Sequence, residues 1–474
     1  MKMREVMKPT MILSVAVLMA ATMFVRPTQA EPDAVTAMWA WDYNASVSTQ
    51  ERRERLLRFS RQVDANVLFV GTRTTLAGAE PKYADLIQRA HAQGIRVFAL
   101  AGESAWALTE HHPAAIRHIS QVLDFNARHP STPFDGIQLD VEPYTLPKYA
   151  DDPAGIGAQL LRLLDTAGQL VPAEMELNAA IPFWYASSHR PRTVDYNGVE
   201  KPLSHHILDL VDSVSIMAYR DTADAQIELS SIDVEYAGKV GKLAYVGAET
   251  LPPDGERIPE FVTYSGKNVH YMNVQLEAIR RHYADHPGFG GVAVHTYDSY
   301  QAMLQQEEET MERQFRELRD AGIMTGYPDG TTGFGKPTTR AEVAAIAARI
   351  AGYTEATLER PAEAAFRDVS PRQWFYGWVE SARRIGAVQG RGDRTFEPNG
   401  MITVEEAFSV MAKTIGLAED RNAAVPGASD WAQGWIGAMA NAGYEDRRPG
   451  YRYEMAREEL VELAYETYRL KRRE

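Results

Sequence analysis

The residues best suited to chemistry lie in one short stretch, FDGIQLDVEPY, at positions 134–144. This stretch is typical of a strand, and side chains along a strand alternate between its two faces. Gln138, Asp140 and Glu142 therefore share one face, and the apolar residues between them share the other. Carboxylates two residues apart on a strand lie about 7 Å apart, so the charge of one raises the pKa of the other. A carboxyl group that keeps its proton near neutral pH can act as a general acid.

Eight short runs of apolar and β-branched residues between residues 34 and 300 predict the strands that position these groups. The runs are 35–41, 65–70, 95–100, 134–141, 175–181, 211–218, 243–246 and 290–295. Amphipathic helical patterns lie between most of them, at 50–63, 83–93, 113–127, 156–170 and 274–283. After the fifth run the connection is irregular, with a loop at 187–202 and a short helix at 203–210, which indicates an insertion. Eight such units predict an α/β fold, a closed (β/α)₈ TIM barrel.

In such a barrel the polar face of residues 138–142 points inward, at the carboxyl end of the fourth strand. Barrel interiors are normally filled with branched apolar residues, so a buried polar row carries a desolvation cost. The carboxyl ends of the strands are also where barrel active sites lie. A structural alternative remains open, in which these carboxylates cap the next helix or form an internal salt-bridge network.

Two motifs give this region its resemblance to the family-18 glycoside hydrolases, the chitinase-like barrels. DGIQLDVE at 135–142 resembles the D-G-x-D-x-D-x-E motif of that family, and SIMAYR at 215–220 resembles its M-x-Y-D motif. The resemblance implies that Glu142 is the general acid/base, that Asp140 orients the N-acetyl group of the substrate, and that Tyr219 hydrogen-bonds the acetamido group. Asp135 opens the first motif. Gln138 and Arg220 each stand where the family has an aspartate.

The resemblance implies retaining hydrolysis of an extracellular, N-acetylated polysaccharide, with the acetamido oxygen of the substrate as nucleophile and no cofactor. A second scheme pairs Glu142 with Glu249, in YVGAET at the end of the seventh predicted strand, because many retaining glycosidases use two carboxylates about 5 Å apart. A third interpretation is a surface glycan-binding protein that has lost turnover, which the departures at Gln138 and Arg220 favour. A purely structural surface-layer component fits the acidic row least.

Aromatic residues near the predicted carboxyl ends of strands favour a sugar ligand. They are Trp39, Trp41, Trp106 and Trp184, with Tyr297 after the eighth strand. Aromatic faces stack on the apolar faces of pyranose rings and commonly line sugar clefts. Aromatic residues at strand ends are equally common as core filler. His295, at the end of the eighth strand, can contact a substrate, although a lone histidine is more often structural.

From about residue 310 one pattern is used three times. Its fullest copy contains FRDVS at 366–370, Trp374, GAVQG at 386–390, FEPNG at 396–400 and ITVEE at 402–406. The other copies contain TTRAE at 338–342 and MAREE at 455–459. The pattern resembles the S-layer homology domain, and we predict an all-α module of three units at 311–360, 361–420 and 421–474, after a barrel at 31–310. A generic helical repeat that binds nothing is the alternative.

That family holds exported proteins to the secondary polymer of the cell wall, which implies the same partner here. The arginine of the T-R-A-E-like motif helps bind the anionic polymer in the family, and this role falls on Arg340 and Arg457. The second unit has Val404 at that position.

Composition and the N-terminal segment indicate where in or outside the cell the protein is found. The chain has 474 residues, 50 Lys and Arg against 64 Asp and Glu, and no cysteine. The net charge of −14 argues against nucleic-acid binding, and the lack of cysteine excludes disulfides and thiolate metal sites; we predict no metal. Residues 1–30 have the layout of a secretory signal peptide, with a basic head and an apolar run at 11–25 that is shorter than the roughly 20 residues of a membrane span. We expect a secreted protein of the cell surface, with no membrane span after the signal is removed.

Overall fold

The computed structural model describes residues 35–186, 193–267, 269–327, 330–444, 446 and 450–473. The expected signal segment, 1–30, lies outside these residues. Within the described part, every helix is too short or too polar to cross a bilayer.

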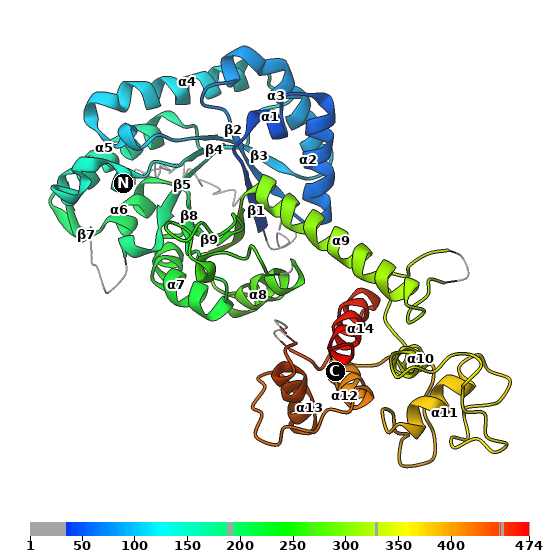
Figure 1. Ribbon diagram of the computed structural model, residues 1–474. Helices are drawn as coiled ribbons and strands as arrows, with labels where there is room; N and C mark the ends of the chain where they lie inside the picture. Colours follow the sequence, from blue (N-terminus) through cyan, green and yellow to red (C-terminus); the bar gives the residue numbers. More distant parts are fainter. Residues whose placement is uncertain are drawn as a thin grey trace, which may run out of the picture. The chain divides into compact units, whose positions relative to one another are not determined.

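Eight parallel strands close into a barrel, as the sequence predicts (Figure 1). They are β1 (Val35–Ala40), β2 (Val67–Gly71), β3 (Arg96–Ala101), β4 (Gly136–Leu139), β5 (Glu176–Pro182), β8 (Ser213–Met217), β9 (Leu243–Glu249) and β10 (Phe289–His295). Each strand pairs with the next one in this series, and β10 pairs with β1 to close the ring. The insertion predicted after the fifth strand contains an antiparallel hairpin, β6 (Thr193–Tyr196) and β7 (Val199–Pro202).

Helices surround the barrel. They are α1 (Tyr43–Ser46), α2 (Gln50–Gln62), α3 (Leu76–His91), α4 (His112–Arg128), α5 (Pro153–Leu170), α6 (Leu203–Leu210), α7 (Ala223–Val240), α8 (Val269–His282) and α9 (Tyr297–Asp320). The predicted short helix at 203–210 is confirmed. The sequence patterns did not single out α7, because its buried face includes Gln226, Ser230 and Asp233 and so lacks a continuous apolar stripe.

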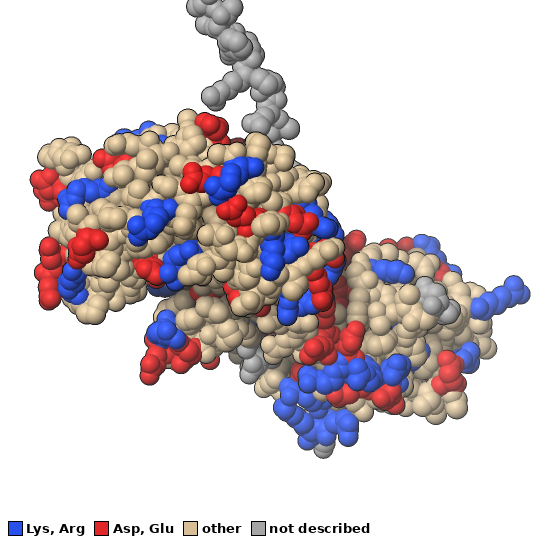
Figure 2. Space-filling model, turned by 90° about the horizontal axis from the view of Figure 1, so that it is seen from above, with Lys and Arg blue, Asp and Glu red and all other residues tan. Residues whose placement is uncertain are grey.

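The apolar faces of the strands pack on these helices and form the main core. Ile137 and Leu139 of β4, for example, are buried in one cluster with Leu160 and Leu164 of α5. A second, smaller cluster fills the inside of the barrel and includes Trp39, Phe69 and Phe98. At the surface, acidic and basic side chains are interspersed over much of the face seen in Figure 2. Beneath the surface, the buried Arg53 of α2 pairs with Asp85 of α3 at 2.6 Å.

The C-terminal region is helical, with α10 (Arg340–Ile350), α11 (Tyr376–Arg384), α12 (Val404–Thr414), α13 (Asp430–Asn441) and α14 (Arg457–Lys471). Three short segments that precede α10, α12 and α14 join in a ring of backbone hydrogen bonds. Thr338 N donates to Met455 O, Met455 N to Ile402 O, and Ile402 N to Thr338 O, at 2.9–3.0 Å. Residues 338, 402 and 455 each lie two positions before their helix, so these three segments meet in an approximate threefold arrangement.

Helix α9 belongs to both regions. Its first turns place Tyr297, Tyr300 and Met303 in the barrel core. Its last turns place Phe315 and Leu318 in the core of the C-terminal helices. The continuous helix occupies the sequence where the first repeat lacks the F-x-D-V segment seen at 366–369.

Candidate active site

Asp140 lies immediately after β4, at the carboxyl end of the barrel. Its backbone N–H donates to Ala101 O at 3.0 Å, which continues the pairing of β4 with β3. The Oδ1 atom is closed off from solvent and has no hydrogen-bond partner in the described part of the chain. Burial, and after it the charge of Glu142, raises the pKa of Asp140 to about 7, with His295 opposing the shift. Asp140 is therefore protonated in mildly acidic solution.

Glu142 is held by the next aromatic residue in the chain. The Tyr144 hydroxyl donates a hydrogen bond to Glu142 Oε1. Burial, followed by the negative charge of Glu142, raises the pKa of Tyr144, so this hydroxyl keeps its proton. The Tyr144 ring meets Trp184 edge-on at 5.2 Å between centroids. This chain of contacts orients the carboxyl group that the sequence predicts as the acid/base.

Tyr219 follows β8 and reaches the same carboxylates. Burial raises its pKa well above the usual value, and the charges of Glu249 and Asp140 add to the shift. Its ring lies nearly parallel to that of His295, with centroids 6.0 Å apart. Tyr219 therefore presents a protonated hydroxyl, a hydrogen-bond donor, beside Asp140.

Glu249, at the end of β9, is buried and bound on several sides. Its Oε1 accepts hydrogen bonds from the backbone N–H groups of Thr250 and Leu251, both at 2.8 Å. His295 Nδ1 lies 3.0 Å from Oε2. These contacts fix the carboxylate against the protein and hold the imidazole of His295 in place.

Gln138, inside the barrel, is fully buried and belongs to a polar layer. Its amide N–H₂ donates to Asn178 Oδ1 at 2.9 Å and to Ser215 Oγ at 3.1 Å. An amide cannot ionise, so Gln138 places no second negative charge below Asp140. These two bonds satisfy the amide N–H₂ group, whereas Gln138 Oε1 is buried without a hydrogen-bond partner among the described residues.

Of the predicted aromatic residues, some lie near the carboxylates or at the surface, and the others are buried in the core. Trp184 contacts Tyr144 at the site, and Trp41 is 36% exposed. Trp39 is buried and lies edge-on to His295, with centroids 5.7 Å apart. Trp106 and Tyr297 are buried in the core, against His118 and Phe59 respectively, and do not face the carboxylates.

Asp135 lies at the opposite end of β4. Its Oδ2 accepts from the backbone N–H of Val97 at 2.7 Å and contacts His91 Nε2 at 2.9 Å. The four residues of β4 lie between Asp135 and Asp140, and five steps along a strand span about 16 Å. The structure thus gives Asp135 the position of a residue that ties β4 to β3, away from the other site residues.

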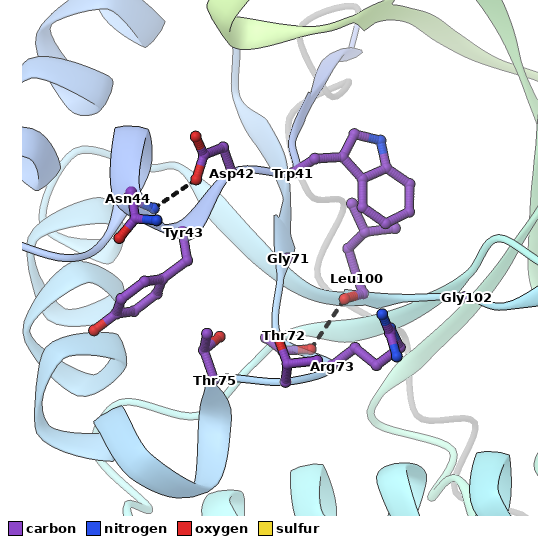
Figure 3. Close-up of a pocket in the computed structure, with 11 residues that line it drawn as sticks. Trp41, Asp42, Tyr43, Asn44, Gly71, Thr72, Arg73, Thr75, Leu100 and Gly102 are labelled. Atoms are coloured by element: carbon purple, nitrogen blue, oxygen red, sulfur yellow. Dashed lines mark hydrogen bonds between the residues drawn. The ribbon is translucent and has the colours of Figure 1, made fainter.

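A cavity of about 360 Å³ lies at the carboxyl ends of β1, β2 and β3 (Figure 3). Trp41, Leu100 and the Arg73 guanidinium lie on one side of it, with Tyr43 and Thr75 on the other. Gly102, which lines this cavity, packs closely against the backbone of Asp140. A Cβ at position 102 would lie only 1.7 Å from Asp140 O, so only glycine fits there. Arg73 pairs with Glu103, so its charge is balanced.

Tyr144 was not assigned from the sequence, and for His295 the sequence indicated a substrate contact or a structural role but not its pairing with Glu249. Tyr144 follows Glu142 by two residues, and that spacing is the signal that could have found it. His295 contacts Glu249, from the neighbouring strand, and a contact between strands is invisible without the register. Within the described residues, no group of three or more His, Asp or Glu is placed to hold a metal ion.

In the C-terminal region, Arg340 and Arg457 have matching, mostly buried surroundings. Arg340 Nε donates to Phe396 O at 2.9 Å and Nη1 lies 3.3 Å from Glu406 Oε1. Arg457 Nε donates to Thr332 O at 2.7 Å and Nη1 lies 3.3 Å from Glu342 Oε1. Each guanidinium thus holds a loop of the neighbouring repeat.

The third position of this set is filled differently. Val404 stands where the arginine would be. Glu459 corresponds to Glu406 and Glu342, the partners of the two arginines, and it accepts from the Tyr453 hydroxyl at 2.6 Å. Glu342, which pairs with Arg457, also accepts from a tyrosine hydroxyl, that of Tyr327, at 2.8 Å.

Comparison with known families matches residues 365–408 to the S-layer homology domain. The chain carries an S-layer homology domain. The expected first unit, 311–360, and the expected third unit, 421–474, both lie outside this match. Two similar proteins are the "Middle cell wall protein" of Brevibacillus brevis, 30% identical over 106 residues, and the "Cell surface protein" of Thermoanaerobacter kivui, 26% identical over 122 residues. The aligned segments cover 22% and 26% of this chain but 10% and 15% of those proteins.

Solved structures similar to the N-terminal region include several chitinases. One is a chitinase from Bacteroides thetaiotaomicron, at 11% identity and a TM-score of 0.37, covering 56% of this chain and 90% of that one. Another is a family-18 chitinase from Cycas revoluta, in complex with (GlcNAc)4, at 14% identity and a TM-score of 0.37, covering 56% and 96%. The S-layer homology domain and the surface-protein relatives point to the cell surface or cell wall.

Proposed function

We propose that this protein is a surface-anchored glycoside hydrolase that cleaves an N-acetylated polysaccharide with retention. One observation carries the proposal: Asp140, Glu142 and Tyr219 lie within range of one another's charges at the carboxyl end of the barrel. Asp140 has a raised pKa, and the Tyr219 hydroxyl keeps its proton. A carboxyl that accepts from the acetamido N–H, an acid/base and a hydrogen-bond donor are the groups that substrate-assisted glycoside cleavage needs.

In this scheme Glu142 protonates the glycosidic oxygen, and the acetamido oxygen of the substrate attacks the anomeric carbon. Asp140 hydrogen-bonds the acetamido N–H, and Tyr219 donates to the acetamido oxygen. Tyr144 orients Glu142 through its hydroxyl. Water then attacks the anomeric carbon of the cyclic intermediate, with Glu142 as the base, and the configuration is retained.

The alternative that pairs Glu142 with Glu249 has less support from the geometry. Two backbone N–H groups and His295 already engage the Glu249 carboxylate. A nucleophile must present a free oxygen toward the anomeric carbon. Glu249 is better suited to holding the His295 imidazole, whose ring lies against that of Tyr219.

We further propose that the C-terminal region binds the chain to a cell-wall polymer, and that units one to three together form the binding module. The support is the S-layer homology domain at 365–408 and the approximate threefold ring of repeats around it. Full-length protein should sediment with purified cell walls, whereas protein that ends at residue 308 should remain in solution. Equal sedimentation of the two forms would contradict this part of the proposal.

The catalytic proposal is tested by hydrolysis of chitin oligomers and of peptidoglycan glycan chains. Glu142→Gln should lower kcat by about 10²- to 10⁴-fold on an N-acetylated substrate, because it removes the acid/base. Glu249→Gln should lose less activity than Glu142→Gln, and its product should still have the retained anomeric configuration. Glu256→Gln, in an exposed loop, is the matched control.

Two other outcomes would replace the proposal. Equal loss in Glu142→Gln and Glu249→Gln on a substrate without an acetamido group would favour the two-glutamate scheme. Glycan binding without turnover by the wild type would favour a non-catalytic glycan-binding barrel, for which the uncharged Gln138 is the supporting observation.

A further inference from the structure

Arg220 occupies an unusual position on the catalytic face of the barrel. It follows Tyr219 directly, so its Cα lies about 3.8 Å from that of a residue which contacts the reaction centre. Its side chain is partly buried. The family that the barrel resembles has an aspartate at this place, so the charge here is reversed.

Two aromatic rings hold the guanidinium. Its central carbon lies 5.3 Å from the ring centroid of Phe183, after β5, and 5.3 Å from that of Phe261, after β9. Nη1 donates to Tyr219 O at 2.7 Å. A planar cation between two rings has little freedom to turn, so its remaining N–H groups point in a set direction.

The charge of Arg220 is not balanced by a neighbouring carboxylate. No acidic side chain of the described residues lies within ion-pair distance of it, and the adjacent Asp221 pairs with Lys267 at 2.7 Å. By contrast, Arg73, on the opposite side of the barrel mouth, pairs with Glu103. Arg220 is therefore a preorganised cation without an internal counter-ion in this part of the chain.

Two ring contacts and one peptide linkage connect Arg220 to the hydrogen-bond partner of the proposed acid/base. Phe183, on which the guanidinium lies, is followed in the chain by Trp184. Trp184 contacts Tyr144, and Tyr144 donates to Glu142. An exposed ring, Phe261 at 55%, continues the surface on the far side of the guanidinium. Sugar rings that extend from the cleaved bond would meet this aromatic surface and the cation within it.

We propose that Arg220 is a specificity residue that binds a carboxylate substituent on the glycan, in a sugar unit next to the cleaved bond. This rests on the proposed function and names its substrate class: an N-acetylated glycan that carries carboxylates. A guanidinium fork matches the two oxygens of a carboxylate, and a lysine would not reproduce that geometry. The carboxylate can come from a lactyl ether, as on N-acetylmuramic acid, or from a pyruvyl ketal.

The test measures binding to full-length protein carrying Glu142→Gln, so that no probe is consumed. The probes are a tetrasaccharide of alternating N-acetylglucosamine and N-acetylmuramic acid, the same tetrasaccharide with its carboxyl groups reduced to hydroxyls, and an oligosaccharide with a pyruvyl ketal. We expect at least one carboxylated probe to bind about tenfold or more tightly than the reduced one. The stronger of the two carboxylated probes identifies the source.

Arg220→Gln added to this protein should abolish the preference, and Arg220→Lys should retain only part of it. Arg257→Gln is the matched control, because Arg257 is 88% exposed in the loop after β9 and pairs with Asp254. It should leave the preference unchanged. Equal binding of carboxylated and reduced probes, measured before any change at Arg220, would overturn the inference even if the Arg220 variants do not fold.

Turnover by the wild type separates this inference from the proposed function. A protein that discriminates between the probes through Arg220 but hydrolyses none of them would contradict the glycosidase proposal and leave the inference standing. A protein that hydrolyses carboxylated and reduced probes with the same kcat/KM would support the glycosidase and overturn the inference.

Discussion

At the scale of single residues, Asp140 has an unusual protonation state for an aspartate, because its pKa is raised to about 7. Its carboxyl is enclosed beside Glu142, and Gln138 contributes an amide below it where a further carboxylate would have added charge. Removing solvent from a carboxyl favours the neutral form, so the site stores a proton at a pH where ordinary aspartates have lost theirs. The cost of that arrangement is a dependence of stability on pH.

Asp140→Asn should remove this dependence of the free energy of unfolding on pH. The pKa of Asp140 is about 7 in the folded chain and about 3.9 when unfolded, so between these values the folded state holds a proton that the unfolded state has released. Wild-type stability should therefore fall, relative to Asp140→Asn, as the pH rises from about 4 to about 7, by up to about 4 kcal/mol.

Urea unfolding at pH 4.5 and pH 8 measures the difference. The exposed Asp151→Asn serves as the control and should follow the wild type at both values. A constant difference between wild type and Asp140→Asn across this range would show that Asp140 is ionised throughout.

At the scale of elements, the C-terminal repeats begin their second helices in the same way, with one exception. Thr339 and Thr403 cap α10 and α12, each with a glutamate three residues later that returns a hydrogen bond to the cap backbone. Before α14 the cap is Ala456, which has no side-chain acceptor, although Glu459 Oε2 still accepts from its N–H at 2.9 Å. The backbone angles at Ala456, −74° and 158°, are close to those at the two threonines.

Ala456→Thr should therefore stabilise the C-terminal region by about 1 kcal/mol, because it completes the capping box on a backbone already in the right conformation. Thr403→Ala should destabilise it by a similar amount. Thermal unfolding of both variants checks the pair. A loss of stability in Ala456→Thr would indicate that the added methyl and hydroxyl groups do not fit beside the ring of backbone hydrogen bonds.

At the scale of the whole molecule, two hydrophobic cores share one helix. Tyr297, Tyr300 and Met303 of α9 serve the barrel, and Phe315 and Leu318 serve the C-terminal helices. The barrel therefore needs the first half of α9, which lies beyond the last strand.

A chain that ends at residue 308 should unfold cooperatively, with a midpoint close to that of the barrel transition in full-length protein. A chain that ends at residue 296 should lose several kcal/mol, because three buried side chains are removed. Differential scanning calorimetry distinguishes the two. Equal midpoints for both truncated forms would show that α9 contributes nothing to the barrel.

Local patterns were sufficient for the architecture. The eight strands, the short helix at 203–210 and the repeats after residue 310 are visible in the sequence, because burial on one face imposes a period on apolar residues. The carboxylates at 140 and 142 follow from alternation along one strand. Trp106, Tyr297 and Asp135 carry local signals of the same kind, and the structure places the first two in the core and the third at the other end of β4.

Only the tertiary structure decided which residues meet. The pair of Glu249 with His295, the clamp of Phe183 and Phe261 on Arg220, and the burial that raises the pKa of Asp140 all join different strands of the barrel. The same holds for Arg340 and Arg457, whose glutamate partners belong to neighbouring repeats. A sequence determines such contacts through the closure and register of the whole barrel or ring, and no single stretch of it contains that information.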